Sequence, residues 1–126
     1  MFEQPNLPAF ELPNELSVAY GGTIGFTTPR VYANFVESLD GVTALPGVHE
    51  SGRLIAGGSE HDRFVMGLLR AFADVVLIGA GTLYGSPQTH WTPAHAYPPA
   101  AALYANTRKQ RALPPVPTLA VFTGSG

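Results

Sequence analysis

The chain has 126 residues, of which 45% are hydrophobic and only 13% are charged, and its formal net charge is −2. This composition excludes a disordered chain, which carries more charge, and disfavours a protein that binds nucleic acid through phosphate contacts, which is usually basic. Because cysteine is absent, there is no disulfide scaffold, thiolate nucleophile or cysteine zinc site. The length suits a single domain.

The N-terminal sequence and the apolar runs bear on localisation. The first five residues, MFEQP, lack the basic and apolar regions of a signal peptide. No apolar run approaches the ~20 residues that span a bilayer. We therefore expect a soluble, cytoplasmic protein without a membrane partner.

Residues 1–28 are interrupted by prolines and glycines and are predicted to form an N-terminal arm. One short helix is expected inside the arm, with Asn14 as its N-cap and Gly21 as its end. The remainder is predicted to lie over the domain that begins at residue 29, and a mobile tail is the alternative.

The first predicted strand covers residues 31–36, which are rich in β-branched and aromatic side chains. An Asp40-Gly41 turn follows the strand. Residues 42–54 mix glycine, proline and polar side chains, and a loop with at most a short hairpin is expected there.

The strongest helix prediction covers residues 60–73. Ser59 is its expected N-cap, and Asp62 completes a pattern that resembles a capping box. Apolar side chains recur at helical spacing from Phe64 to Phe72. The apolar run 75–78 that follows reads as a buried parallel strand, so that 31–36, 60–73 and 75–78 would form one strand–helix–strand unit.

The C-terminal third is predicted to contain a long irregular loop at 85–98, a helix from Ala100 to about Arg111, and a third buried strand at 119–122. The last four residues, TGSG, resemble a loop that enters a further helix. Three strands are few for a covered parallel sheet. We therefore expect an α/β fold that is incomplete at its C-terminus.

All three predicted strands end in small or hydroxyl-bearing residues, which predicts a shared ligand site beyond the carboxyl ends of the strands. The three ends are residues 38–41, 79–82 and 123–126. Turn chemistry alone is the alternative explanation. The glycines at 79 and 81 do not complete a dinucleotide fingerprint, and no P-loop is present.

Two other features permit a functional and a structural interpretation. The segment Gly57-Gly58-Ser59 precedes the strongest helix and suits a bound anion, although an ordinary capped helix explains it equally well. The four histidines lack the spacing of a metal site, so no metal is predicted and surface or internally bonded histidines are expected.

Three segments resemble the pyrimidine reductase family of riboflavin biosynthesis, whose fold is dihydrofolate-reductase-like. The matching segments are NFVESLDG (34–41), SGRLI (51–55) and LLRAFADVVLIGAGT (68–82). The resemblance extends over residues 29–126, and the third segment is its most specific part. It implies a mainly parallel central sheet flanked by helices, of which this chain holds the N-terminal part.

The resemblance implies an NADPH-dependent reductase that transfers a hydride to a ribosylamino-pyrimidine phosphate or a related heterocycle. Such an enzyme mainly positions cofactor and substrate. The implied cofactor-binding residues are Val36, Arg53, Gly79, Gly81, Thr82, Ser86, Thr123, Gly124 and Ser125. The implied substrate-binding residues are Asn34, Ser51 and Arg70, and Asp40 is a candidate catalytic residue.

Some of these assignments have alternatives. Arg70 suits a phosphate group, but it also suits a cation at a helix C-terminus. Ser86 stands where the bifunctional reductases carry an aspartate, which suggests a branch with a different substrate. The alternatives are a pterin-type reductase of the same fold and a non-catalytic nucleotide-binding fragment. As partners we expect a second copy of the chain or a missing C-terminal half.

Overall fold

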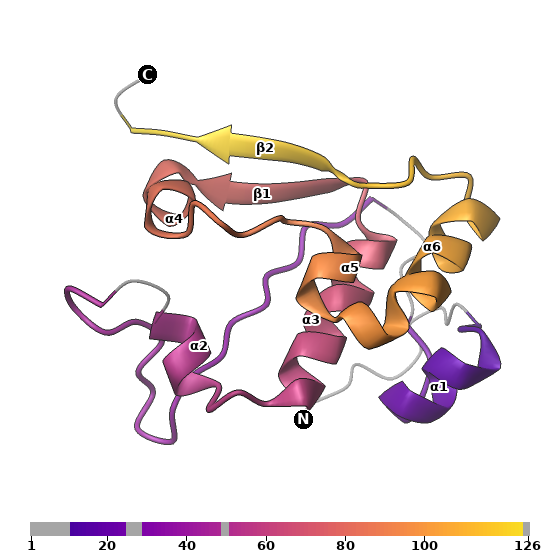
Figure 1. Cartoon of the computed structure of the whole chain (residues 1–126), viewed down its shortest axis with the longest axis horizontal. Coiled ribbons are helices and arrows are strands. Elements are labelled where there is room, and N and C mark those ends of the chain that lie inside the picture. Colours follow the sequence, from indigo (N-terminus) through magenta and orange to yellow (C-terminus); the bar gives the residue numbers. More distant parts are fainter. Residues whose placement is uncertain (1–10, 25–28, 49–50, 125–126) are drawn as a thin grey trace. The chain divides into compact units, whose positions relative to one another are not determined.

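The computed structural model describes residues 11–24, 29–48 and 51–124. The chain divides into two compact units, Met1–Ala33 and Asn34–Gly126, and each is described by itself. Figure 1 shows the elements in chain order.

The first unit contains helix α1 (Asn14–Tyr20), which confirms the predicted helix. Its N-cap is Pro13, which makes no side-chain capping bond, so the prediction of Asn14 as N-cap was wrong by one residue. The C-terminal prediction was right: Gly21 adopts the left-handed conformation with φ 80° and its amide donates to the Ser17 carbonyl. Only glycine adopts this conformation without steric cost. The predicted arm outside 11–24 lies beyond the described residues.

The predicted strand at 31–36 is absent, because these residues form no regular secondary structure. The side chains of Val31 and Phe35 are exposed. β-branched and aromatic residues favour a strand only where a neighbouring strand accepts their hydrogen bonds and packs on their faces. No strand of the described chain pairs with this segment, so the predicted unit 31–78 does not form.

The turn after this segment is confirmed, since Gly41 has φ 84° and its amide donates to the Ser38 carbonyl. The predicted loop at 42–54 was wrong in its last part, where helix α2 (Ser51–Ile55) begins. This helix packs beside Val36: a Cβ added to Gly52 would lie 3.7 Å from Cγ1 of Val36.

Helix α3 (Glu60–Phe72) confirms the strongest prediction. The Ser59 hydroxyl accepts a hydrogen bond from the Asp62 amide at 3.3 Å, as the capping pattern predicted. The apolar stripe is buried at Phe64, Leu68 and Phe72. Local signals therefore determine this helix, and its buried stripe determines what packs on it.

The sheet consists of two parallel strands, β1 (Val75–Gly79) and β2 (Thr118–Phe122), in register from Val75 opposite Thr118 to Gly79 opposite Phe122. This confirms both predicted C-terminal strands and a small α/β arrangement. The connection contains α4 (Ala80–Gly85), α5 (Pro93–Ala96), the 3₁₀ helix η1 (Pro98–Ala100) and α6 (Ala101–Gln110). The predicted irregular loop at 85–98 therefore holds an additional short helix, α5, whose first turn is capped by Thr92.

The prediction that the strands are buried was wrong. Leu77 and Phe122 are 61% and 60% exposed, and Ile78 is the buried side chain of β1. Parallel sheets normally have both faces covered. In the second unit the helices pack mainly on one another, which leaves side chains of both strands exposed.

The core of the second unit lies where α3 meets α5 and α6 (Figure 1). The Tyr104 hydroxyl of α6 donates to the Phe64 carbonyl of α3 at 2.9 Å. At the crossing, Gly67 allows the Tyr104 ring to approach, since a Cβ there would lie 2.7 Å from the ring. None of the helices in the described ranges has the length and apolar character of a membrane span.

Candidate functional site

The parallel register brings two of the three predicted ligand segments to one edge of the sheet. Gly79 ends β1 opposite Phe122 at the end of β2. Gly81 and Thr82 follow in the first turn of α4, while Thr123 and Gly124 follow β2. Figure 1 shows α4 at the carboxyl ends of both strands. Ser125 lies outside the described residues.

The segment 79–82 is not a loop but a direct junction between β1 and α4. Gly79 is extended and occupies the N-cap position of α4. An added Cβ on Gly81 would meet no atom within 4 Å, so packing does not require glycine at this position. Thr82 is exposed. The edge thus presents backbone and a hydroxyl group to whatever approaches it.

A second group of predicted residues gathers around α2. Val36 packs against this helix through Gly52, which brings it close to Ser51 and Arg53 on the same helix. Asn34 and Arg53 are exposed. The segment that was expected to carry Asn34 and Val36 into the sheet forms no strand, and the contact at Gly52 places Val36 beside α2.

Asp40 lies in the exposed turn after this segment. The Ser38 hydroxyl donates to the Asp40 carboxylate and also accepts from the Val42 amide at 3.1 Å. These bonds hold the turn together. They give Asp40 a structural role in this structure.

Ser86 is the C-cap of α4, and its amide donates to the Leu83 carbonyl at 3.3 Å. Its own carbonyl accepts from Thr89 at 3.0 Å. The residue is half-buried and directs the chain away from the sheet edge into the segment 86–92.

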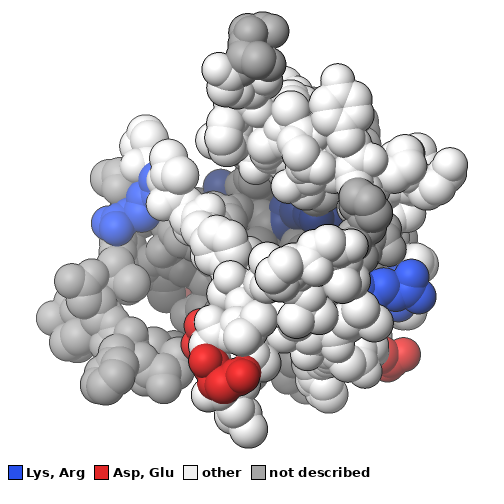
Figure 2. Space-filling model, turned by 90° about the vertical axis from the view of Figure 1, so that its left-hand side faces the viewer, with Lys and Arg blue, Asp and Glu red and all other residues white. Residues whose placement is uncertain are grey.

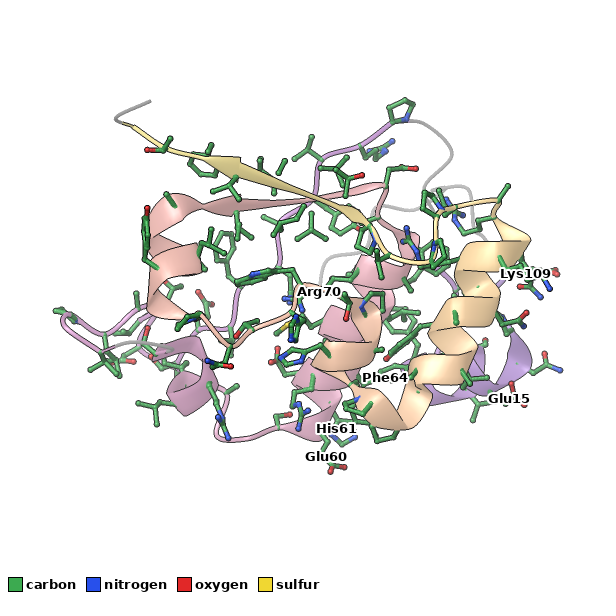
Figure 3. All side chains as sticks on the ribbon, turned by 45° about the horizontal axis from the view of Figure 1, so that its top comes forward. Glu15, Glu60, His61, Phe64, Arg70 and Lys109 are labelled. Atoms are coloured by element: carbon green, nitrogen blue, oxygen red, sulfur yellow. The ribbon has the colours of Figure 1, made fainter. Side chains whose placement is uncertain are left out.

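Arg70 extends from the last turn of α3 toward Trp91, and its guanidinium carbon lies 5.2 Å from the ring centroid (Figure 3). Such a contact combines cation–π attraction with stacking. Burial lowers the pKa of Arg70. The carbonyls at the end of α3 are bonded by Arg108 of α6 instead, which leaves Arg70 directed at the aromatic ring.

Two histidines that the sequence analysis placed on the surface are exposed and also lie together. The rings of His90 and His95 are 5.2 Å apart and nearly perpendicular. Thr92 and Pro93 start α5 between them, and this short helix turns His95 back toward His90. In the sequence, the two histidines flank a Thr-Pro helix start, and this pattern could have predicted that their rings lie together. The sequence analysis compared their spacing only with that of metal sites.

The electrostatic surroundings of these histidines are positive. Desolvation lowers the pKa of His95, and His90, Arg70 and Arg63 lower it further. The Arg63 Nε is fixed by a hydrogen bond to the Ala96 carbonyl at 3.0 Å. We call Arg63, Arg70, His90 and His95 the cationic cluster. Within the described ranges, no three His, Cys, Asp or Glu side chains gather to hold a metal ion.

Two surface hollows lie elsewhere, along α6 and the segment that follows it. Their volumes are about 80 Å³ and about 500 Å³, and both are lined largely by alanine, proline and the stem of Arg108. Neither is lined by any residue predicted to bind cofactor or substrate. Ligand sites usually combine an apolar cavity with a few convergent polar groups. The two hollows contain none of the polar residues predicted to bind a ligand, so we place the candidate site at the strand edge and the cationic cluster.

Comparisons with known proteins add no relative: no family model, curated protein or solved structure matches the chain.

Proposed function

We propose that the chain is the N-terminal part of an NADPH-dependent reductase with a dihydrofolate-reductase-like fold, similar to the pyrimidine reductases of riboflavin biosynthesis. The observation that supports it is the parallel register of β1 and β2, which joins residues 79–82 and 123–124 at one edge. Ligands of open α/β sheets bind at such edges.

The residues at the edge fit a dinucleotide. The open space at Gly81 allows a ligand to approach the backbone, and the exposed Thr82 hydroxyl can donate to it or accept from it. In this proposal Gly79, Gly81 and Thr82 hold one part of NADPH and residues 123–125 hold another. When bound, NADPH supplies a hydride, and the protein holds the acceptor in line with it.

The substrate side of the proposal consists of Asn34, Ser51 and Arg70, with Val36 and Arg53 near the cofactor. Ser86, in place of an acidic residue, cannot carry a negative charge at neutral pH. We therefore propose a substrate that differs from the riboflavin precursor, reduced at a polarised carbon–nitrogen double bond of a heterocycle or a ribosylamino group.

A non-catalytic nucleotide-binding role is the second candidate, favoured by one observation. The structure joins two strand ends at the edge, while the third predicted segment, 38–41, is a turn stabilised by its own hydrogen bonds. A partial edge of this kind can bind a nucleotide without completing the geometry that hydride transfer requires.

We also propose that the apolar strands are covered in the working protein, by a second copy or by a C-terminal half of the same domain. Val75, Leu77, Val121 and Phe122 are each more than 40% exposed. Exposed, uncharged strands favour pairing with another chain or segment.

The substitution Thr82→Val tests the cofactor site. Loss of one hydrogen bond of about 1 kcal/mol corresponds to about a fivefold higher Kd for NADPH. Thr118→Val is the matched control, because Thr118 is also exposed but lies at the opposite end of β2. An equal Kd for Thr82→Val and the unmodified chain would remove Thr82 from the site.

A further inference from the structure

The two hollows along α6 are parts of one furrow, because Ala105, Arg108 and Pro115 line both of them. Helix α6 forms one wall of this furrow. The other wall is formed by α5 at one end and by the segment 113–116 at the other. Figure 1 shows this segment turning back from the end of α6 toward β2. The larger hollow, with a volume of about 500 Å³, therefore lies between the C-terminal half of α6 and the segment that follows it.

Hydrogen bonds fix the walls of the larger hollow. The Nε of Arg108 donates to the Pro114 carbonyl at 2.6 Å, and the Leu113 amide donates to the Arg108 carbonyl at 2.9 Å. Both bonds tie the segment to α6, and the proline rings at 114 and 115 restrict its backbone further. A ligand that enters a hollow held in place in this way binds without ordering the protein around it.

The surface of the larger hollow is apolar with one exposed cation. Four of its six lining residues are Ala105, Ala112, Leu113 and Pro115, and the buried stem of Arg108 adds methylene groups. The remaining lining residue is Lys109, which is exposed. Figure 3 shows Lys109 on the outer side of α6, near the end of the helix.

The size of the larger hollow suits a small molecule. Its volume of about 500 Å³ lies within the range of about 300–1,000 Å³ that is typical of small-molecule sites. Such sites usually combine an apolar lining with a small number of polar or charged groups. The larger hollow has this combination, with Lys109 as its exposed charged group.

The charge at this end of α6 is positive. Residues 75–126 contain no aspartate or glutamate, and Arg108, Lys109 and Arg111 fall within four positions. The negative end of a helix dipole is equivalent to only about half a charge, which three cations exceed. The face of the molecule with α2 and α4 differs, because Figure 2 shows acidic and basic side chains together there. The sign of the charge beside the larger hollow favours an anion over a cation.

We propose that the larger hollow binds a small carboxylate that carries an apolar chain or ring. The apolar part of the ligand lies against Ala105, Leu113 and Pro115, and its carboxylate pairs with the ammonium group of Lys109. Burial of the apolar part supplies most of the affinity, because an exposed ion pair contributes little. The ion pair selects the sign of the ligand's charge.

This site goes beyond the proposed reductase activity. None of the residues that line the larger hollow belongs to the strand edge, to α2 or to the cationic cluster. Its formation therefore requires neither NADPH nor the substrate of a reductase.

The test is a calorimetric titration of the chain with octanoate, below the concentration at which octanoate forms micelles. Octanol, octylammonium and acetate are titrated in parallel. We expect saturable binding of octanoate at one site. Octanol should bind about fivefold more weakly, because it lacks the charge that pairs with Lys109. Octylammonium should bind more weakly than octanol, and acetate, which has no apolar chain, should show no saturable binding.

Two exposed positions on α6 provide matched variants. Ala105→Phe places a ring in the larger hollow and should raise the Kd for octanoate about tenfold or more. Asn106→Phe is the control, because Asn106 is the next exposed residue and lines neither hollow. It should leave the Kd unchanged. Circular dichroism checks that both variants keep the helical content of the unmodified chain.

The charge of Lys109 is tested separately. Lys109→Gln should raise the Kd for octanoate about fivefold and leave the Kd for octanol unchanged. Lys109→Arg keeps the charge and should keep the affinity for octanoate.

Three results would overturn the site: no saturable binding of octanoate, equal affinity for octanoate and octanol, or unchanged affinity for octanoate in a folded Ala105→Phe variant. Because these titrations contain no NADPH, their failure leaves the cofactor proposal intact. A failed NADPH titration likewise leaves the carboxylate site intact.

Discussion

Arg108 of α6 links three parts of the second unit, although it is a charged side chain with only 1% exposure. Its Nη1 donates to the carbonyls of Arg70, Ala71 and Ala73, at 3.2, 3.2 and 2.8 Å. Its Nε donates to the Pro114 carbonyl at 2.6 Å. The side chain therefore satisfies carbonyls at the C-terminus of α3 and fixes the segment that leads into β2.

We predict that Arg108→Met destabilises the chain by about 3 kcal/mol, because the bond to Ala71 is buried and its loss alone costs ~1–3 kcal/mol. The other three carbonyls are partly exposed and can be hydrated, so each contributes ~0.5–1 kcal/mol. Relief of the cost of burying a guanidinium offsets part of the sum. Methionine keeps much of the apolar stem, which limits the loss of packing.

The assay is urea unfolding followed by Trp91 fluorescence and by circular dichroism. With an m-value of ~1.5 kcal/mol/M, the expected loss lowers the midpoint by ~2 M. Lys109→Met, a neighbouring exposed cation on the same helix, is the control and should leave the midpoint nearly unchanged. If Arg108→Met unfolds within 0.3 M of the unmodified chain, on the order of the extrapolation error, the four bonds do not stabilise the fold.

Two further predictions concern packing and pH. Gly67→Ala should lower the free energy of unfolding by about 1–3 kcal/mol, because the added methyl group would lie 2.7 Å from the buried Tyr104 ring. Gly52→Ala is the control, and both variants are measured by urea unfolding. Equal stability of the two variants would contradict the close approach of Tyr104 to Gly67. Because the folded pKa of His95 is lowered, the unfolded chain binds more protons, so unfolding free energy should fall as pH drops through about 6.5. His95→Gln should weaken this dependence in buffers free of phosphate and sulfate, and an identical pH profile in the variant would contradict it.

Helix α3 and the two strands could be predicted because their signals are local. Ser59 caps the amide of Asp62 within one turn of helix, and the apolar stripe from Phe64 to Phe72 repeats at helical period. The runs 75–78 and 119–122 are short, apolar and bounded by turns, and they pair with each other.

The segment 31–36 shows where such reasoning fails. Its composition favours a strand, but a strand depends on a neighbour, and sequence composition does not reveal whether a neighbour is present. The same limit explains the exposure of β1 and β2, which were expected to be buried.

The cationic cluster and Arg108 could not be predicted, because both depend on contacts between distant segments. Arg108 lies in the last turn of its own helix, yet it bonds carbonyls more than 30 residues away, at the end of α3. Trp91 meets Arg70, and His90 meets His95, only because α5 packs on α3. Parallel topology was enough to predict that the ends of β1 and β2 meet at one edge of the sheet. It could not predict that Val36 lies beside α2, away from that edge.

The central claim, that the chain belongs to an NADPH-dependent reductase, is tested most directly by titrating it with NADPH and, in parallel, with NADH, while following nicotinamide fluorescence. We predict saturable binding with a lower Kd for NADPH than for NADH. Absence of saturable binding in a chain that circular dichroism shows to be folded, or equal affinity for the two dinucleotides, would contradict the claim.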